Sequence, residues 1–451
     1  MKLLFSRFIT CGLVLMFAVT SAIVAQDGMP DRPRSEKLLN ELDVVIWSTA
    51  GTDRVTVRLR IHNGAAYDPR GKAGTFALLG DILFPEQGVR DYFREDLDGD
   101  VTVEVTYDYV EVTGTARADE FLTVLETLAP ALMNTEITKE TTEKLKTKQL
   151  AWLDDAGNDP KRAVSKAAAT RLFGEFPYGR PVEGTPETIR SIDFADLIYV
   201  RERFLTADNA TLSIVGDVRS DYAYLAARRL MGGWKKAGTE IPATFRLPEA
   251  PLKDTETIYV EGEVGRHGAA AVESFARKHR LYHAAEILSR VIDARLRMSS
   301  ADREGLSAEA SNEGFLLKGI FLVATADRSP EATVPGADSR LPARAGLIDW
   351  LSLPVTEKEF NEAHAAYFGE LSRTGRDRLR ADVETYGLGS AKDEMAAVRD
   401  LKIEDVRAAA KELLSRTAVE VVMISRPPAV PDVPADPKDP LRRDASEPDL
   451  K

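Results

Sequence analysis

The stretch from Asn63 to Phe84 reads NGAAYDPRGKAGTFALLGDILF, and it says more about the fold than any other part of the chain. It opens with a turn, DPRG at residues 68–71, because proline and glycine favour the backbone angles of tight turns. The residues from Phe76 to Phe84 are almost wholly apolar. A helix that is apolar on most faces is buried, so the sequence predicts a helix inside a domain, packed on a sheet.

This stretch resembles the metal-binding helix of the inverzincins, the family of pitrilysin and the mitochondrial processing peptidase, whose signature is H-x-x-E-H. Setting Gly74 and Leu83 against the family pattern places the first histidine at Ala77, the glutamate at Gly80 and the second histidine at Asp81. In the family, two imidazoles on one helix face hold a Zn²⁺ ion and the glutamate activates its bound water. The resemblance therefore implies a scaffold that is kept and a catalyst that is lost.

A second segment carries the same resemblance. It reads FPYGRP at residues 176–181 and GTPET at residues 184–188, before a helix expected from Asp196 to about Leu205 and a strand expected from Ala210 to Val218. This order resembles the latter part of a family domain, where a P-Y-G-x-P turn and a G-T-x-E-T cap precede a final helix and a V-G-D-V strand.

An internal repeat supports the same architecture independently of the family. Each copy is a helix opened by an aspartate and followed by an apolar strand, at a constant offset of 209 residues. The pairs are Ile192/Leu401, Asp196/Asp405, Leu197/Val406, Phe204/Leu413, Leu205/Leu414, Leu212/Val421 and Ile214/Met423. A second repeated pair is Ile137-Thr138 and Val355-Thr356, each of which is expected to start a helix. Two diverged copies of one α+β unit explain these matches.

The predicted fold is α+β, with two homologous α/β-sandwich halves, each a mixed, largely antiparallel sheet with helices. The resemblance implies that the halves face each other across a cleft. We expect the halves at residues 36–240 and 250–426, with the boundary in the proline-containing stretch 237–254.

Local patterns place several elements in the first half. Alternating apolar residues predict strands at 44–46 and 55–61, and a pair at 101–106 and 109–113. Asp119 and Thr138 are the expected caps of two helices that run to about residues 132 and 153.

The two ends of the chain differ from the rest. Residues 1–25 resemble a secretory signal, with Lys2 and Arg7 before an apolar run and a cut expected after Ala25. The single cysteine, Cys11, lies inside this signal, so the mature chain has no disulfide, cysteine nucleophile or cysteine metal site. Residues 427–451 carry seven prolines and are expected to be disordered. We expect a secreted or periplasmic protein without a stable membrane anchor.

Charge and motifs exclude other chemistries. The formal net charge is −12, and it becomes −14 without Lys2 and Arg7, which argues against nonspecific binding to nucleic acid. No G-x-S-x-G elbow occurs, and the glycines before Lys72 lack the spacing of a phosphate loop.

The third metal ligand of the family is a glutamate on a later helix, which corresponds to residues 149–155. This window reads QLAWLDD and contains no glutamate. Asp154 and Asp155 could bind a metal, but adjacent residues point about 100° apart on a helix, so only one could face a site. Solvated carboxylates are the favoured interpretation, and no metal ligand is predicted in this chain.

In the second half, REGL at residues 303–306 resembles the R-E-x-x-G-L-x-Y element, whose arginine and tyrosine help to hold a peptide substrate. The tyrosine position falls at Ala308, in a shortened loop. Arg303 is therefore the predicted substrate-binding residue, with its guanidinium on a peptide carbonyl. A surface arginine paired with Glu304 or Asp302 remains an equal alternative.

His279, His283 and Glu286 have a spacing that could bring three ligands to one helix face. Their order matches no established zinc signature, so surface histidines are the favoured interpretation.

The resemblance implies a non-catalytic subunit of an exported heterodimeric zinc metallopeptidase, with no catalytic residue and no cofactor of its own. The partner would be an inverzincin subunit with an intact H-x-x-E-H and the Zn²⁺, and this chain would complete the chamber and help to bind peptide. One alternative is a stand-alone peptide-binding or scaffold protein. Another is a peptidase with an unusual site at His279 and His283.

Overall fold

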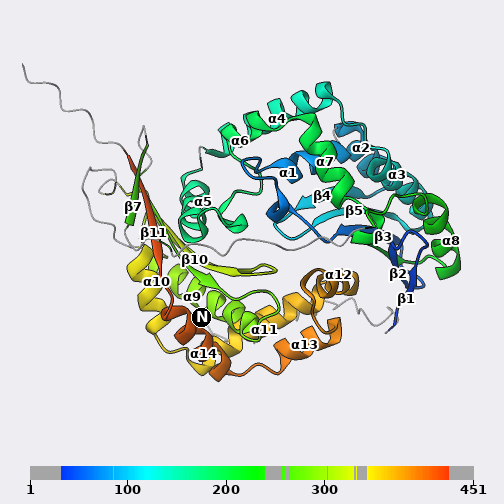
Figure 1. Cartoon of the computed structure of the whole chain (residues 1–451). Coiled ribbons are helices and arrows are strands. Elements are labelled where there is room, and N and C mark those ends of the chain that lie inside the picture. Colours follow the sequence, from blue (N-terminus) through cyan, green and yellow to red (C-terminus); the bar gives the residue numbers. More distant parts are fainter. Residues whose placement is uncertain are drawn as a thin grey trace, which may run out of the picture.

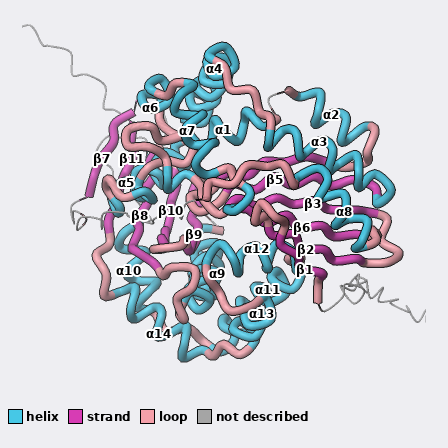
Figure 2. The backbone as a smooth tube through the Cα atoms, turned by 45° about the vertical axis from the view of Figure 1, so that its right-hand side comes forward, coloured by secondary structure: helices cyan, strands magenta, loops and turns pink. Residues whose placement is uncertain are grey.

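The computed structural model describes residues 32–84, 86–157, 159–238, 251, 255–260, 265–301, 303–329, 332 and 343–425. Two β-sheets with helices packed against them make up this part of the chain (Figures 1 and 2). The predicted signal, the predicted tail and most of the predicted boundary stretch lie outside the described residues. No helix in the described ranges has the length and apolar character needed to cross a membrane.

The first sheet has six strands in the order β1-β2-β6-β3-β5-β4. Strands β2 and β6 are parallel and the other neighbours are antiparallel. The strands are β1 (Arg34–Lys37), β2 (Asp43–Ser48), β3 (Arg54–Ile61), β4 (Asp100–Val105), β5 (Val110–Arg117) and β6 (Ala210–Gly216).

The second sheet has the order β7-β11-β8-β10-β9, with only the β7/β11 pair parallel. This order repeats β2-β6-β3-β5-β4 strand for strand, so the predicted fold class of two homologous mixed halves is confirmed. The strands are β7 (Thr255–Val260), β8 (Arg266–Ser274), β9 (Leu306–Gly314), β10 (Gly319–Asp327) and β11 (Val419–Ser425).

Fourteen α-helices of the described chain accompany the sheets, and most of them cover one sheet face in each half. The first eight are α1 (Thr75–Leu83), α2 (Gln87–Glu95), α3 (Phe121–Met133), α4 (Lys139–Gly157), α5 (Pro160–Phe173), α6 (Pro186–Ser191), α7 (Phe194–Phe204) and α8 (Ser220–Met231). The others are α9 (Tyr282–Ser300), α10 (Ala343–Ser352), α11 (Glu357–Arg373), α12 (Arg376–Tyr386), α13 (Ala391–Arg399) and α14 (Ile403–Leu414).

Helix α1 is the predicted buried helix, and seven of its nine residues are buried. The buried carboxylate of Asp68 fixes its start by accepting hydrogen bonds from the backbone N–H groups of Gly74 (2.7 Å) and Phe76 (2.9 Å). Gly74 has a φ of 95°, which favours glycine. Arg180 of the FPYGRP turn donates to the carbonyls of Ala66 and Asp68, so this turn holds the entry to α1 in place.

The repeated aspartates lie one turn inside their helices. Helix α7 is capped by Asp193, whose backbone is extended as a cap requires. The Asp196 carboxylate accepts a hydrogen bond from the backbone N–H of Asp193, which completes a capping box. Asp405 has the same place in α14, where it accepts from the N–H of Lys402 at 3.0 Å. The prediction that Asp196 opens the helix was therefore wrong, although the repeat is correct.

The two predicted caps of the earlier helices had different outcomes. Thr138 accepts a hydrogen bond from the N–H of Thr141 at 3.1 Å, which confirms it as the start of α4. Asp119 lies in a short 3₁₀ helix, Ala118–Glu120, and caps nothing, because the chain makes this extra turn before α3 begins.

Helix α5 belongs to the first half in sequence but packs on the second sheet (Figure 1). This helix was not predicted. Asp159 caps it and Pro160 occupies its first turn. The apolar cluster beneath it contains Val164, Ala168, Leu172, Phe173, Phe176 and Tyr178 from the first half, and Ala269, Ala271, Ile320, Leu322, Ala324, Val419, Val421 and Met423 from the second sheet.

Helix α12 makes the reciprocal contact on the first sheet, and this contact is ionic. The odd-numbered residues of β3 face the core, while Arg58 and Arg60 face the opposite way, because side chains alternate along a strand. Arg58 binds Asp377 at 2.9 Å and Arg60 binds Asp382 at 2.5 Å, both on α12. Glu111 of β5 also pairs with both arginines.

Two hairpin turns also meet between the halves. Asp108, in the β4–β5 turn, accepts from the hydroxyl of Tyr178 (3.1 Å) and from the N–H of Leu316 (3.0 Å) in the β9–β10 turn. The Tyr178 hydroxyl in turn accepts from the N–H of Leu317 at 3.1 Å. Phe315 packs against the Tyr178 ring, with the ring centroids 4.6 Å apart. The halves are therefore joined by both exchanged helices and by these turns.

We expect Asp68→Ala to lower the free energy of unfolding by about 1–3 kcal/mol, because two buried N–H groups lose their acceptor. Urea unfolding of the full chain measures this change. Asp155→Ala on the exposed face of α4 is the matched control, and its effect should stay within about 0.5 kcal/mol. Equal losses in the two variants would contradict the role of Asp68.

The junction should also respond to pH. Burial raises the pKa of Asp108 to about 7. The hydrogen bonds that it accepts from Leu316 and Tyr178 act in the opposite direction, but burial has the larger effect. Because this value lies above the pKa of an unfolded aspartate, its contribution to stability is complete below about pH 4 and is lost as the pH rises through 7. Between pH 5 and pH 8, wild-type protein should lose about 2–3 kcal/mol more unfolding free energy than Asp108→Asn. Parallel stability curves for the two proteins would refute this assignment.

Candidate functional site

The three positions that align with the family's ligands and base share one face of α1. Ala77, Gly80 and Asp81 line a cavity of about 430 Å³ between α1, β4, α4 and the start of α5. The other lining residues are Val103, Val105, Lys148, Gln149, Trp152, Arg162, Val182 and Glu183.

Gly80, which stands at the position of the catalytic glutamate, is closely packed. A Cβ atom added to it would lie 2.7 Å from Cγ2 of Val105 and 3.3 Å from Cγ1 of Val103. Both valines belong to β4, the edge strand of the first sheet. Strand β4 therefore occupies space that a glutamate at position 80 would need.

Asp81 is the one potential metal ligand on this face of α1. Burial raises the pKa of its carboxyl group, while the charges of Lys148 and Arg90 act in the opposite direction. A partly buried carboxyl group of this kind favours its neutral form more than an ordinary aspartate does, and this weakens it as a ligand.

The window predicted to hold a third ligand contributes Gln149 and Trp152 to the cavity. The Gln149 side-chain amide donates to the carbonyl of Glu183 at 2.9 Å. Asp154 and Asp155 are exposed and do not line the cavity. Neither of these two aspartates therefore faces Asp81 across the cavity.

These residues do not fit a zinc ion. Zinc requires about three nitrogen, oxygen or sulfur donors from the protein, and Ala77 and Gly80 supply none. Across the part of the chain that the structure describes, no three histidine, cysteine, aspartate or glutamate side chains are grouped so that they could hold a metal. The cavity keeps the position of the family's metal site without its donor set.

A charged cluster forms the wall opposite α1. Arg162 and Lys166 of α5 both form ion pairs with Glu183. Burial alone would raise the pKa of Glu183, but the hydrogen bonds from Lys166 and Arg162 outweigh it and lower the pKa. The Arg162 guanidinium also lies 4.5 Å from the centroid of the Trp152 ring. The sequence prediction missed this cluster, and its only local signal was the helix start at Asp159-Pro160.

The alternative site at His279, His283 and Glu286 does not assemble. His279 stacks on Phe275, with ring centroids 4.8 Å apart. His283 is buried and hydrogen bonds to the Tyr367 hydroxyl (2.8 Å) and to Glu394. These contacts make His283 part of the second core and not a surface histidine, so the surface interpretation was wrong for this residue.

Glu286 lies on the same helix, and its carboxylate accepts from Asn312 at 2.7 Å. Burial raises its pKa to about 7. This neighbourhood accounts for Glu286 as a hydrogen-bonded core residue.

Arg303 lines a second cavity, of about 420 Å³, where the two halves meet. Lys161 of α5 lines it from one side, and Ala308, at the predicted tyrosine position, lines it from the other. The Arg303 side chain is exposed and has no hydrogen bond or ion pair with another described residue. Asp302, one of the two partners considered from the sequence, lies outside the described residues, and the substrate-binding role of Arg303 stays a prediction.

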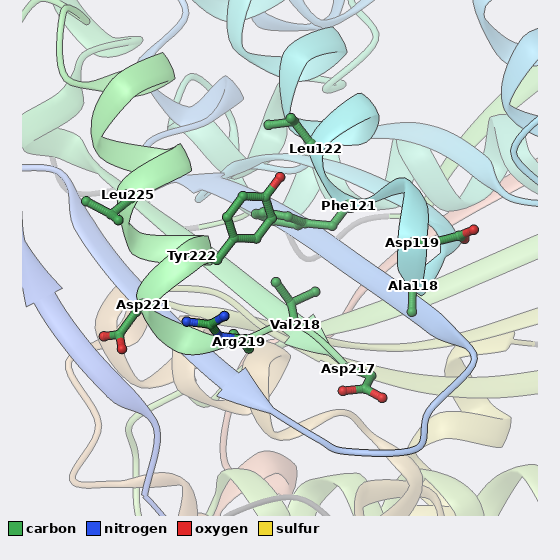
Figure 3. Close-up of a pocket in the computed structure, with 10 residues that line it drawn as sticks. All are labelled: Ala118, Asp119, Phe121, Leu122, Asp217, Val218, Arg219, Asp221, Tyr222 and Leu225. Atoms are coloured by element: carbon green, nitrogen blue, oxygen red, sulfur yellow. The ribbon is translucent and has the colours of Figure 1, made fainter.

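A third cavity lies on the outer surface between α3 and α8, away from α1. Figure 3 shows the Tyr222 ring of α8 next to Phe121, with Leu225 one turn further along α8. Two carboxylates at its edge already have partners, because Asp217 accepts from the N–H of Gly51 and Asp221 pairs with Arg34. This cavity lies away from the positions that the sequence pointed to.

We expect the triple substitution Ala77→His, Gly80→Glu and Asp81→His to restore neither zinc binding nor peptidase activity. The glutamate would overlap Val105, and position 149 still lacks a carboxylate. Metal analysis and peptide hydrolysis measure both properties. About one tightly bound Zn²⁺ per chain with hydrolysis would contradict this expectation.

A matched pair of glycine substitutions isolates the packing effect. Gly80→Ala should destabilise the protein by about 1–3 kcal/mol. Gly88→Ala in α2, where the new methyl group meets open space, should be neutral or stabilising.

Comparisons with known proteins agree with this geometry. Residues 43–186 match the family model described as insulinase (peptidase family M16), and residues 191–367 match the model described as peptidase M16 inactive domain. Together the two matches span most of the chain. A search of curated proteins found no match.

Several solved structures share the fold. A protease from Helicobacter pylori superposes with a TM-score of 0.77 at 17% identity, over 87% of this chain and 99% of its own. A peptidase M16 inactive domain from Pseudomonas fluorescens superposes with a TM-score of 0.74 at 18% identity, over 88% of this chain and 98% of its own. A chain of Complex III2 from Candida albicans superposes with a TM-score of 0.70 at 15% identity, over 87% of this chain and 95% of its own. At these identities the likeness shows the fold alone.

The family signature H-x-x-E-H occurs nowhere in the sequence, and the cavity at its expected position lacks the ligands and the base. From the two family matches we conclude that the chain belongs to the pitrilysin (M16) peptidase family.

Proposed function

We propose that this chain is the non-catalytic subunit of an exported heterodimeric zinc metallopeptidase. A catalytic M16 subunit with an intact H-x-x-E-H would hold the Zn²⁺ and cleave the peptide. This chain would complete the chamber and help to bind the peptide, and it would carry no cofactor itself. The signal-like pattern of residues 1–25 supports export to the periplasm or beyond the cell.

One observation carries the proposal: the family scaffold is intact where its catalytic groups are missing. Helix α1 is capped, buried and packed on the sheet, yet the face that lines the cavity carries Ala77, Gly80 and Asp81. A fold that is kept without its catalyst supports a role in binding or assembly. The match of residues 191–367 to an M16 inactive domain supports the same role.

The cavity around Arg303 supports a contribution to peptide binding. It lies where the halves meet, and the guanidinium is not engaged by another described side chain. A guanidinium stays charged at any working pH and can donate two hydrogen bonds to backbone carbonyls. A scaffold without a peptidase partner would use the same cavity, so the decisive test is the activity of a partner.

We expect a catalytic M16 partner, reconstituted with this chain, to lose activity when the chain is omitted. Arg303→Ala should lower kcat/KM by tenfold or more, which corresponds to about 1.5–3 kcal/mol for a charged hydrogen bond. The stoichiometry of the complex should not change, because Arg303 faces a cavity. Peptide turnover and analytical ultracentrifugation measure the two properties.

Arg399→Ala is the matched control, because Arg399 is exposed and pairs only with its neighbour Asp400 among the described residues. Full turnover with Arg303→Ala would leave Arg303 as an ordinary surface arginine. Full turnover by the partner alone would reject the accessory-subunit proposal.

A further inference from the structure

We propose that a cavity in the second half, between α9, β9 and α11, binds a small organic cation, an ammonium or guanidinium group on an apolar stem. The carboxylate of Glu286 would receive the charge, and the stem would lie on the small apolar residues around it. This site is separate from the cavities beside α1 and Arg303, and the inference does not depend on a partner subunit.

The cavity has a volume of about 510 Å³, which is within the range of pockets that hold small ligands. Its place in the fold matches that of the cavity beside α1. Strand β9 is the edge strand of the second sheet as β4 is of the first, and α9 is the first α-helix after β8 as α1 is the first after β3. Helix α11 begins after Thr356, the counterpart of Thr138 before α4. The fold therefore leaves a cavity at the same place in both halves.

Glu286 packs into the second core on one side and lines this cavity on the other. Its Oε1 atom accepts a hydrogen bond from the side-chain amide of Asn312 at 2.7 Å. The hydroxyl of Ser274 donates to the Asn312 side-chain oxygen, which fixes the direction of the amide. Ser274 and Asn312 are both buried. Neutral groups therefore hold the carboxylate in place before any ligand arrives.

The Glu286 carboxylate lacks a counter-ion, because it forms no ion pair with another described residue. Burial raises its pKa to about 7, although the charges of Arg290 and Arg277 act in the opposite direction. Each of these arginines is paired with a different glutamate, Arg277 with Glu394 at 2.7 Å and Arg290 with Glu370 at 2.9 Å. A buried charge needs a charge of opposite sign close to it. A cation in the cavity would supply the one that Glu286 lacks.

The other charged residues that line the cavity have partners of their own. The pairs are Asp293–Arg297, Glu359–Arg295, Glu362–Lys358 and Arg290–Glu370. The lining carries four carboxylates and two guanidinium groups, so its charge favours a cation over an anion. Because the two guanidinium groups are already paired, they do not compensate the charge of Glu286.

The rest of the lining suits an organic cation better than a metal ion. In the described ranges, no three potential metal-binding side chains are grouped together. The apolar lining residues are small, and they are Val291, Ala294, Ala310, Ala363 and Ala366. Small side chains leave room for an aliphatic stem, and burial of that stem adds a hydrophobic contribution to the ionic one.

The test uses the full chain alone and two pairs of probes that differ only in charge. The first pair is butylguanidinium and butylurea. The second is a blocked six-residue Gly/Ser peptide that carries either one arginine or one citrulline. Ligand-observed NMR titrations at pH 8, above the pKa of Glu286, measure the affinities. The charged member of at least one pair should bind at least about tenfold more tightly than its neutral isostere.

Glu286→Gln should remove this preference, because it removes the charge and keeps an oxygen that can accept from Asn312. Glu357→Gln is the matched control, because Glu357 is exposed on α11 and does not line the cavity, and it should keep the preference. Ala294→Leu fills the cavity from α9 and should weaken binding about tenfold. Ala365→Leu, at an exposed alanine of α11 outside the cavity, should leave binding unchanged. Circular dichroism checks that each variant is folded.

The outcomes separate the source of the cation from the existence of the site. A preference for butylguanidinium alone assigns the site to free amines or guanidines, and a preference for the arginine peptide assigns it to a side chain of a polypeptide. Equal affinity within both pairs would overturn the inference. A preference that persists in Glu286→Gln would also overturn it, because the attraction would then come from the net negative charge of the whole chain.

Discussion

The molecule depends on how the second face of each β-sheet is covered. Its own helices cover one face, and a helix from the other half covers the opposite face: α5 through apolar contacts and α12 through ion pairs. The fully buried guanidinium of Arg60 lies between Glu111 of the first half and Asp382 of α12, so removal of both carboxylates would leave an uncompensated buried charge. The two halves are therefore joined by buried apolar contacts and by ion pairs, and the Arg303 cavity is lined by residues of both.

The lost catalytic site shows how substitution and packing become linked. Without a glutamate side chain on α1, Val105 packs directly over Gly80. The wall that could have carried a third ligand is engaged in a separate network around Glu183. A glutamate at position 80 would have to displace Val105 of β4, so we expect the site to need more than the restoration of single residues.

The sequence predicts those features that local patterns determine. Helix α1 is recognisable from its apolar run, and the recurrence of α7 and β6 as α14 and β11 follows from residues at a fixed offset. The exchanged helices were missed for a physical reason. Val164, Ala168 and Leu172 have helical spacing, but nothing local shows that their partners lie in the second sheet. Helix α12 reads as a solvated charged segment until its acids are placed beside the arginines of β3. At the site, the motif located the face of α1, but only the fold shows that Gln149 faces it and Asp154 does not.

The exchange of α5 also sets the order in which the chain can fold during synthesis. The polypeptide leaves the ribosome from its N-terminus, and α5 emerges well before β11, which lies inside the second sheet although it is the last strand. The apolar side of α5 packs on β8, β10 and β11, so it is fully covered only after residues 419–423 have been made. Such distant contacts slow folding. The first half therefore cannot bury the apolar side of α5 by its own folding, and this side of the helix stays exposed to solvent until the strands of the second sheet have been made.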